Sequence, residues 1–123
     1  MLKLIAAASV SAFFALTIPL PPIHAQPSST QVSPDAEYVR QLNRAKNLAR
    51  MTVERANGGL GNYRAESAMH GPPLQSPYVD NGDGTWTFTF QGRSPYSDTY
   101  TMESVVTVSE DGVVTMDYNG PIR

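Results

Sequence analysis

The sequence contains no cysteine, and only two histidines and one tryptophan occur among its 123 residues. Without cysteine, the protein forms no disulfide, binds no metal through thiolates, has no thiol nucleophile and carries no lipid on an N-terminal cysteine. The chain also lacks an Asn-X-Ser/Thr acceptor for N-glycosylation. A stable fold therefore depends on a hydrophobic core without covalent cross-links.

Basic residues are not in excess, because nine Lys and Arg stand against eleven Asp and Glu. Proteins that bind nucleic acids usually show a clear basic excess, so we expect no nucleic-acid partner. The charge is unevenly distributed: residues 35–57 carry five basic and three acidic side chains. Residues 58–123 carry eight acidic side chains and three basic ones, which are Arg64, Arg93 and Arg123.

One long apolar run occurs, and it lies at the N-terminus. Residues 4–18 are uncharged and follow Lys3, which matches the core of a signal peptide. A membrane-spanning helix needs about 20 apolar residues, whereas prolines from Pro19 onward end this run early. We expect cleavage after Ala25, removal of residues 1–25, and a mature protein in the periplasm or outside the cell with no membrane span. The alternative is an uncleaved membrane anchor.

Residues 26–33 are polar and contain a proline, which predicts a flexible lead-in. A single domain is expected over residues 34–123. It begins with a helix, in which Pro34 suits the first turn and Asn57-Gly58-Gly59 ends the element. Apolar residues recur at steps of three and four and predict one buried stripe: Tyr38, Leu42, Ala45, Ala49, Val53 and Ala56.

Beyond Gly61 the hydrophobic period changes from 3.6 to 2, which is typical of strands. Alternation indicates strands near residues 63–69, 78–79, 85–91, 99–109 and 113–119, separated by turns. The expected fold class is α+β, with one N-terminal amphipathic helix packed on an antiparallel meander of about four strands. The strand residues expected in the core are Trp86, Phe88, Phe90, Met102, Val106, Val108, Val114, Met116 and Tyr118.

The segments YRAESAM, TWTFTF, TMESVVTVSEDG and VVTMDY follow an alanine-rich helix that ends at NGG. In the order of its elements, this plan over residues 34–119 resembles the exported PepSY and cystatin-like domains. The resemblance implies a module that restrains a protease or docks on a partner. It supplies no motif residues, and the glycine-bearing hairpin with which cystatins contact proteases is not identifiable.

Residues 80–84, DNGDG, raise the question of a calcium loop. An EF-hand needs oxygen ligands at alternate positions and a glutamate at the twelfth place, but Gln91 occupies that place here. Asn-Gly and Asp-Gly are instead typical of tight turns before a strand. Weak calcium binding by Asp80 and Asp83 is the alternative, and we expect no metal site and no cofactor.

His70 is the one histidine of the expected mature chain. A lone histidine can act as a general base, but no nucleophile motif, second metal ligand or carboxylate partner accompanies it in the sequence. We therefore expect no catalysis, with a small hydrolase that uses His70 as the alternative.

Two surfaces are candidates for binding. The first is a basic helix face, which offers an anionic partner a positive strip or is simply solvated; it comprises Arg40, Arg44, Lys46 and Arg50. The second combines the loops HGPPLQSP and GRSPYSD with apolar residues on the outer face of the sheet. Its residues are His70, Leu74, Tyr78, Arg93, Tyr96, Val105 and Val113.

These observations favour a small exported, non-catalytic binding or inhibitor-like module that acts through a sheet edge and loops. The expected partner is a protein or a component of the cell envelope. A structural subunit of an envelope assembly is the alternative that the sequence separates least well. The oligomeric state is left open.

Overall fold

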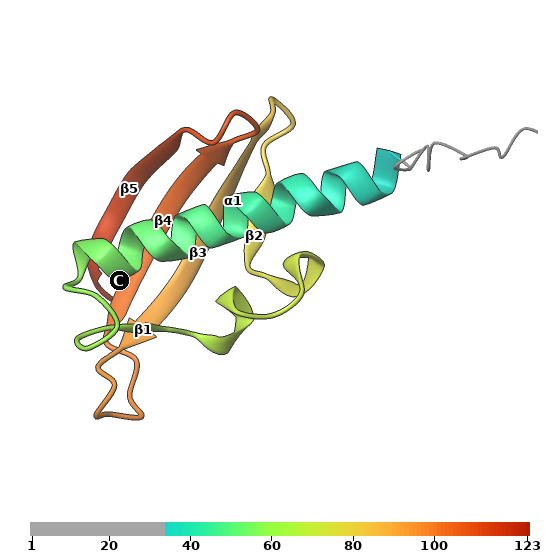
Figure 1. Cartoon of the computed structure of the whole chain (residues 1–123). Coiled ribbons are helices and arrows are strands. Elements are labelled where there is room, and N and C mark those ends of the chain that lie inside the picture. The colour runs from blue at the N-terminus through green and yellow to red at the C-terminus, as the bar shows by residue number, and fades with distance from the viewer. Residues whose placement is uncertain (1–33) are drawn as a thin grey trace, which may run out of the picture. The chain divides into compact units, whose positions relative to one another are not determined.

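The computed structural model describes residues 34–123, so the expected signal peptide and lead-in, residues 1–33, lie outside the described part. One helix lies across one face of an antiparallel sheet, and two short 3₁₀ helices lie between the first two strands (Figure 1). The α+β architecture is therefore as expected. Within the described residues, no helix is both long and apolar enough to cross a membrane.

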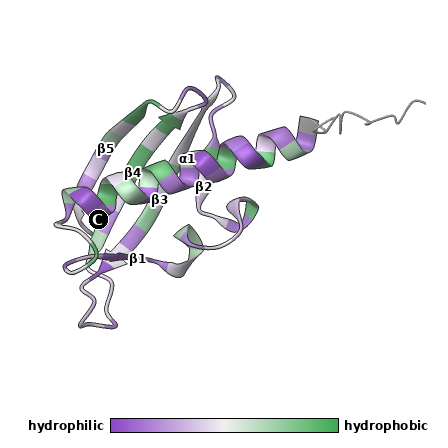
Figure 2. Cartoon of the chain, viewed as in Figure 1, coloured by the Kyte–Doolittle hydropathy of each residue, from purple (hydrophilic) through white to green (hydrophobic). Residues whose placement is uncertain are grey.

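Helix α1 spans Pro34–Ala56 and places acidic residues in its first turn, where the helix dipole favours them. Its buried stripe contains Leu42, Ala45, Ala49 and Val53, each no more than 2% exposed. Ala56 was expected in this stripe but is exposed at the end of the helix. Gly58 and Gly59 follow with positive φ angles, which confirms the predicted helix stop. Figure 2 shows hydrophilic and hydrophobic residues alternating along this helix.

The sheet has five strands: β1 (Arg64–Ala65), β2 (Tyr78–Asp80), β3 (Thr85–Arg93), β4 (Met102–Ser109) and β5 (Val114–Pro121). β1 and β2 both pair with β3, while β4 pairs with β3 and β5. All pairings are antiparallel. One edge of the sheet is thus divided between two very short strands, and β5 forms the other edge.

The core lies between α1 and the inner face of the sheet. Alternate residues of β3 and β4 are buried there, as the period of 2 predicted: Trp86, Phe88, Phe90, Val106 and Val108. Tyr38 of α1 meets Trp86 edge-on, with ring centroids 6.0 Å apart, and the indole N–H donates to its hydroxyl at 3.3 Å. These contacts fix α1 against β3.

The strand expected at residues 63–69 is much shorter than its alternation suggested. Glu66 still donates its backbone N–H to the Gln91 carbonyl at 2.9 Å, but its own carboxylate accepts the Gln91 N–H at 2.8 Å. A side chain thus replaces the backbone partner and ends the ladder. The chain then forms the 3₁₀ helices η1 (Ser67–Met69) and η2 (Pro73–Gln75).

Tyr118 was expected in the core, and that expectation is wrong. The register between β4 and β5 shifts between Val105 and Val106, so that Met116 pairs with Val106 but Tyr118 pairs with Val105. Asp117 is the extra residue of this bulge, and a bulge reverses the side-chain alternation beyond it. The ring of Tyr118 therefore lies on the outer face, where the Arg123 guanidinium covers it at 3.5 Å.

Candidate functional site

A pocket of about 400 Å³ lies at the end of the sheet where β1, η1 and the 94–101 loop meet, which we term the loop end. Its lining comes from three segments that are distant in sequence: Arg64, Ala65 and Ser67; His70; and Arg93, Pro95 and Tyr100. The volume is within the range of small-ligand sites in proteins. The pocket is the meeting point of the two loops that the sequence singled out, because His70 belongs to one and Arg93 and Pro95 to the other.

Two arginines face each other in this pocket. The β1–β3 register pairs Arg64 directly with Arg93. Residues directly opposite in an antiparallel pair have Cβ atoms about 5 Å apart, and like charges there are unfavourable. Arg93 is held by carbonyl groups, since its Nη1 donates to Ser97 at 2.8 Å and to Ser94 at 3.3 Å. The side chain of Arg64 is exposed and makes no hydrogen bond or ion pair with any residue of the described part, 34–123.

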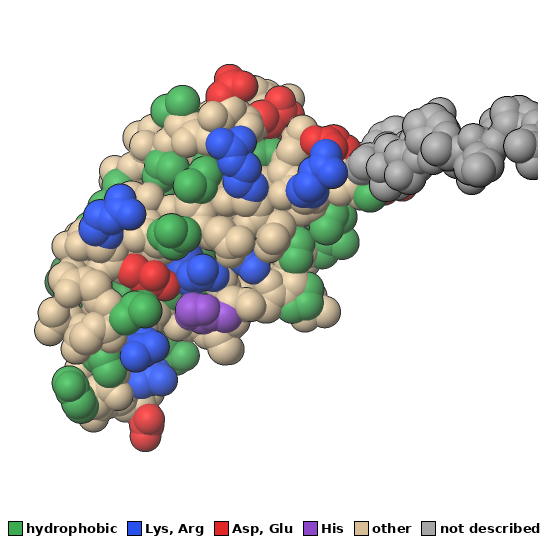
Figure 3. All heavy atoms as spheres, in the orientation of Figure 1, with side chains coloured by type: hydrophobic (Ala, Val, Ile, Leu, Met, Phe, Trp, Pro, Cys, Tyr) green, Lys and Arg blue, Asp and Glu red, His purple; other side chains and the backbone are tan. Residues whose placement is uncertain are grey.

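His70 adds a third nitrogen-bearing side chain to the pocket. Partial burial and the positive charges of Arg50, Lys46 and Arg64 lower the pKa of its imidazole, while Glu54 opposes that shift. Figure 3 shows the histidine (purple) with Lys and Arg side chains (blue) on both sides. The residues that line the pocket therefore carry two formal positive charges, on Arg64 and Arg93, even when His70 is neutral.

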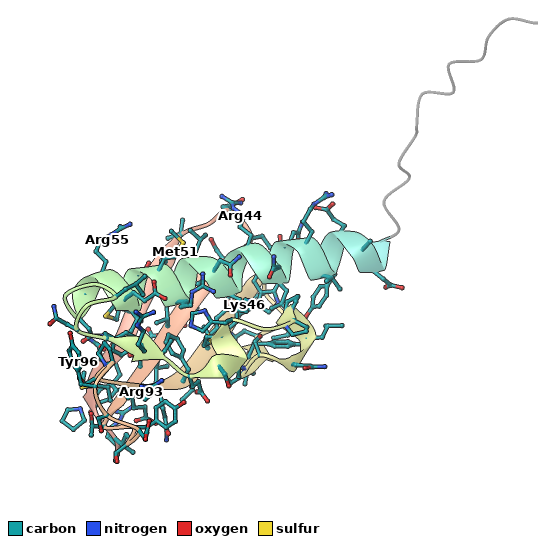
Figure 4. The ribbon with its side chains drawn as sticks, turned by 60° about the horizontal axis from the view of Figure 1, so that its bottom comes forward. Arg44, Lys46, Met51, Arg55, Arg93 and Tyr96 are labelled. Atoms are coloured by element: carbon teal, nitrogen blue, oxygen red, sulfur yellow. The ribbon has the colours of Figure 1, made fainter. Side chains whose placement is uncertain are left out.

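The 94–101 loop is ordered by its own polar groups. Besides the two bonds from Arg93, Ser94 and Ser97 accept backbone N–H groups through their hydroxyls, at 3.3 Å from Tyr96 and 3.1 Å from Thr99. Tyr96 at its tip is 92% exposed, and Figure 4 shows it beside Arg93 at the loop end. A large aromatic side chain is thus presented to solvent on a loop with fixed geometry.

The remaining residues of the predicted partner-binding set do not join this pocket. Leu74 lies in η2 and is 56% exposed, and Tyr78 packs on Phe88 with ring centroids 6.5 Å apart. Val105 lies on the outer face in the middle of β4, and Val113 lies in the β4–β5 turn at the opposite end of the sheet. The predicted set is therefore distributed over several surfaces, of which one brings His70, Arg93 and the Tyr96 loop together.

The predicted basic helix face is not one strip. Arg44 and Lys46 are two residues apart, which is about 200° around a helix, so they lie on opposite sides of α1 (Figure 4). Lys46 is 3% exposed and donates to the Gly71 carbonyl, and Arg50 donates to the Met69 carbonyl at 2.9 Å. Burial lowers the pKa of Lys46, with a smaller effect from the Arg50 charge. Both cations anchor the η1 segment to the helix.

The other two members of that face, Arg40 and Arg44, lie on the exposed side of the helix. Arg40 forms an ion pair with Glu37, one turn earlier, and Arg44 reaches the Glu110 carbonyl at 3.5 Å. An exposed ion pair of this kind contributes little stability. The positive strip expected from the sequence is therefore reduced to two arginines, one paired within the helix and one in contact with the β4–β5 turn.

Sequence reasoning missed Arg64, Ser67 and Tyr100 as site residues. The available signal was the scarcity of positive charge after residue 57, where Arg64 and Arg93 are two of three basic residues among eight acidic ones. Their pairing requires a β1–β3 register between segments far apart in sequence, and alternation patterns do not encode such a register.

Metal or general-base chemistry in the described residues would depend on His70 and on the acidic side chains near it. No group of three or more His, Asp or Glu side chains is placed to hold a metal ion within residues 34–123. The His70 imidazole makes no hydrogen bond with a described residue, and so lacks the orienting partner that a general base in a catalytic triad has. The pocket offers guanidinium and hydroxyl donors, which suit recognition of an anion.

Comparison of the chain with protein-family models, with curated proteins and with solved structures gives no match. The structure itself shows an α+β domain with a cationic pocket at one end of the sheet.

Proposed function

We propose that the protein is a small exported, non-catalytic binding module that contacts its partner through the loop end of the sheet. The observation that supports this proposal is the convergence of the two sequence-predicted loops on one pocket, beside an exposed Tyr96. Tyrosine and arginine, together with tryptophan, are the side chains enriched among the residues that dominate binding at protein interfaces. The partner is a protein or another component of the cell envelope, as expected from the signal-peptide pattern of residues 1–25.

The 94–101 loop is suited to this role because it is already ordered in the unbound protein, so that binding costs little conformational entropy. Arg93, Ser94 and Ser97 fix the loop through hydrogen bonds within it. A preorganised loop loses little conformational entropy on binding, so more of the contact energy appears as affinity. Tyr96 would act as the anchor, and Arg93 beneath it would hold the loop in place.

Site-specific photo-crosslinking tests the proposal. A photoreactive phenylalanine analogue replaces Tyr96 in the full chain, expressed in a host that exports it natively, and a matched analogue replaces Met51, which is 46% exposed on α1. We expect one discrete adduct from position 96 and none from position 51. Equal adducts at both positions, or none at 96, would contradict the proposal. Mass spectrometry of the same material tests cleavage after Ala25.

A structural subunit of an envelope assembly is a second candidate, and the β5 edge favours it. No described residue pairs with the outer side of β5 over Val114–Pro121, whereas the β3 edge is covered by β1, β2 and the Glu66 carboxylate. An open edge can add a strand from another chain. Sedimentation separates the candidates: a monomer up to high concentration contradicts self-assembly, and discrete multimers that form as the concentration rises support it.

A further inference from the structure

Arg64 and Arg93 form a pair of like charges that the protein itself does not neutralise. The two residues are direct partners in the β1–β3 ladder. The ion pairs of the described residues involve other arginines, namely Arg40, Arg50 and Arg123. A pair of opposed, unneutralised arginines costs stability, and such a cost is typical of sites whose charge is used for binding.

The carboxylates that could neutralise the pair are engaged elsewhere or too far away. Glu66 follows Arg64 by two residues in the same segment, but its carboxylate accepts the Gln91 N–H at 2.8 Å. Glu54, which acts on His70, is paired with Arg50 at 3.1 Å. Asp98 of the neighbouring loop forms no ion pair with either arginine. The positive charge is therefore available to a ligand.

The pocket supplies hydrogen-bond donors beside the two guanidinium groups. Ser67 and Tyr100 contribute hydroxyls to its lining, and His70 contributes an imidazole. A guanidinium presents its N–H groups as a planar fork that matches carboxylate and phosphate oxygens, and such charge-assisted bonds are about twice as strong as neutral ones. The apolar part of the lining is limited to Ala65, Pro95 and the ring of Tyr100.

We propose that this pocket binds an oxyanion, a carboxylate or phosphate group, between Arg64 and Arg93, with Ser67 and Tyr100 as further donors. The proposal deepens the proposed function, because it names the chemistry by which the loop end recognises its ligand. Two sources supply the same chemistry: a free small anion, and the acidic side chain of a partner protein. In this proposal Arg64 and Arg93 both contact the ligand. Arg93 also holds the loop, whereas Arg64 has no second role.

The test is an NMR titration of the full chain, purified from the host that exports it, with inorganic phosphate at constant ionic strength. We expect saturable shifts of the backbone amides of residues 64–70 and 93–100 in the millimolar range. Arg64→Gln should weaken binding about tenfold or more, since one charge-assisted pair is lost. Arg64→Lys should weaken it less, because it keeps the charge but loses the fork.

Arg55→Gln is the matched control, since it removes the same charge from an exposed position on α1. It should leave the affinity within about twofold, because a distant exposed charge is largely screened. An absence of saturable shifts, or equal weakening by Arg64→Gln and Arg55→Gln, would overturn the proposal. The titration needs no partner, so its failure is distinguishable from a failure of the crosslinking at Tyr96.

A second arm identifies the source of the oxyanion. A short capped peptide with a central glutamate is titrated beside the same peptide with glutamine. Saturable binding of the glutamate peptide at the same amides assigns the site to a partner's acidic side chain. Binding of phosphate without binding of the peptide assigns it to a small anion, and both results support an oxyanion site.

Discussion

The two ends of the sheet use charged residues in different ways. At the turn end, where the turns 81–84 and 110–113 lie, acidic side chains build the backbone turns. Asp80 accepts the Gly82 N–H at 2.9 Å and the Tyr38 hydroxyl at 2.8 Å, and Asp83 accepts the Thr85 N–H at 3.1 Å. At the loop end, the side chain of Arg64 makes no hydrogen bond or ion pair with any of residues 34–123. Charge that stabilises local structure is thus separated from charge that is free to bind.

The turn end also shows why DNGDG is a turn. Gly82 and Gly84 adopt positive φ angles of 77° and 82°, which glycine accommodates without strain. The Glu110 N–H donates to the Gly84 carbonyl at 2.8 Å, which ties the two turns together. Each aspartate of the motif has a backbone donor, so the acidic residues have a structural role here that Arg64 of the loop end lacks.

The largest expected effect concerns Gly92, which lies beneath the loop end. A Cβ at this position would overlap the ring of Tyr63, which is 2% exposed and cannot move aside. Gly92→Ala should therefore destabilise the fold by about 3 kcal/mol, measured by urea unfolding. Gly61→Ala, where a Cβ meets no atom within 4 Å, is the control. Equal stability of the two variants would show that the Tyr63–Gly92 contact does not define the loop end.

The next effect also concerns Tyr63, whose hydroxyl is buried without a hydrogen-bond partner in the described residues. The Ser104 hydroxyl lies nearby and partly offsets the effect of burial on the pKa of Tyr63, but it donates its own proton to the Asn119 side-chain oxygen at 2.9 Å. An unsatisfied buried donor costs about 1–3 kcal/mol, so Tyr63→Phe should raise the free energy of unfolding by about 1 kcal/mol. A loss of stability would mean that the hydroxyl has a partner, such as a bound water.

The same residue gives a dependence on alkaline pH. Burial raises the pKa of the Tyr63 hydroxyl to about 12 from an ordinary value of 10.0. The unfolded chain loses this proton first, so stability is retained below pH 10.0 and is lost as the pH rises towards about 12. Urea unfolding across this range should show a smaller loss in Tyr63→Phe than in the unsubstituted protein. If the free energy of unfolding falls equally with pH in the two proteins, the raised pKa assigned to the buried Tyr63 hydroxyl is contradicted.

The elements could be predicted from the sequence far better than their pairing. The α1 stripe around Leu42 and Ala49 and the alternation around Phe88 follow from local periodicity, and the structure confirms them. The bulge at Asp117 and the opposition of Arg64 and Arg93 depend on how distant strands align, which a single sequence does not specify.

On the helix, Lys46 likewise shows that contacts between distant segments cannot be predicted from local sequence. The local sequence pattern indicates a solvated position for Lys46. In the structure the 66–71 segment covers this side chain, and the Gly71 carbonyl accepts a hydrogen bond from its ammonium group. Tertiary contacts therefore decided both the burial of Lys46 and the composition of the candidate site. The two loops that border the pocket could be named from the sequence, but their meeting could not.

A smaller effect on the free energy of unfolding tests whether the like-charged pair Arg64 and Arg93 destabilises the loop end. Replacing one member of an opposed like-charged pair should stabilise the sheet by about 0.2–1 kcal/mol, so Arg64→Gln should unfold at higher urea concentration. Arg64→Glu should be more stable still, because it places a carboxylate opposite Arg93. If Arg64→Gln unfolds at lower urea concentration, the arginine has a structural role, and the contrast between the two ends fails.

The smallest effect lies at the turn end and appears only in acid. The Gly82 N–H, followed by the Tyr38 hydroxyl, lowers the pKa of the Asp80 carboxyl below 3.8. The folded state thus favours the ionised form, so its contribution is present above pH 3.8 and is lost as the pH falls through the lowered pKa. Asp80→Asn should therefore unfold more easily than the unsubstituted protein near neutral pH, with the difference shrinking at low pH. Asp98→Asn, in the exposed loop, is the control and should show no such change. A difference for Asp80→Asn that stays constant with pH would mean that shape rather than charge determines the turn, and the division of labour between the two ends would then rest on the arginines alone.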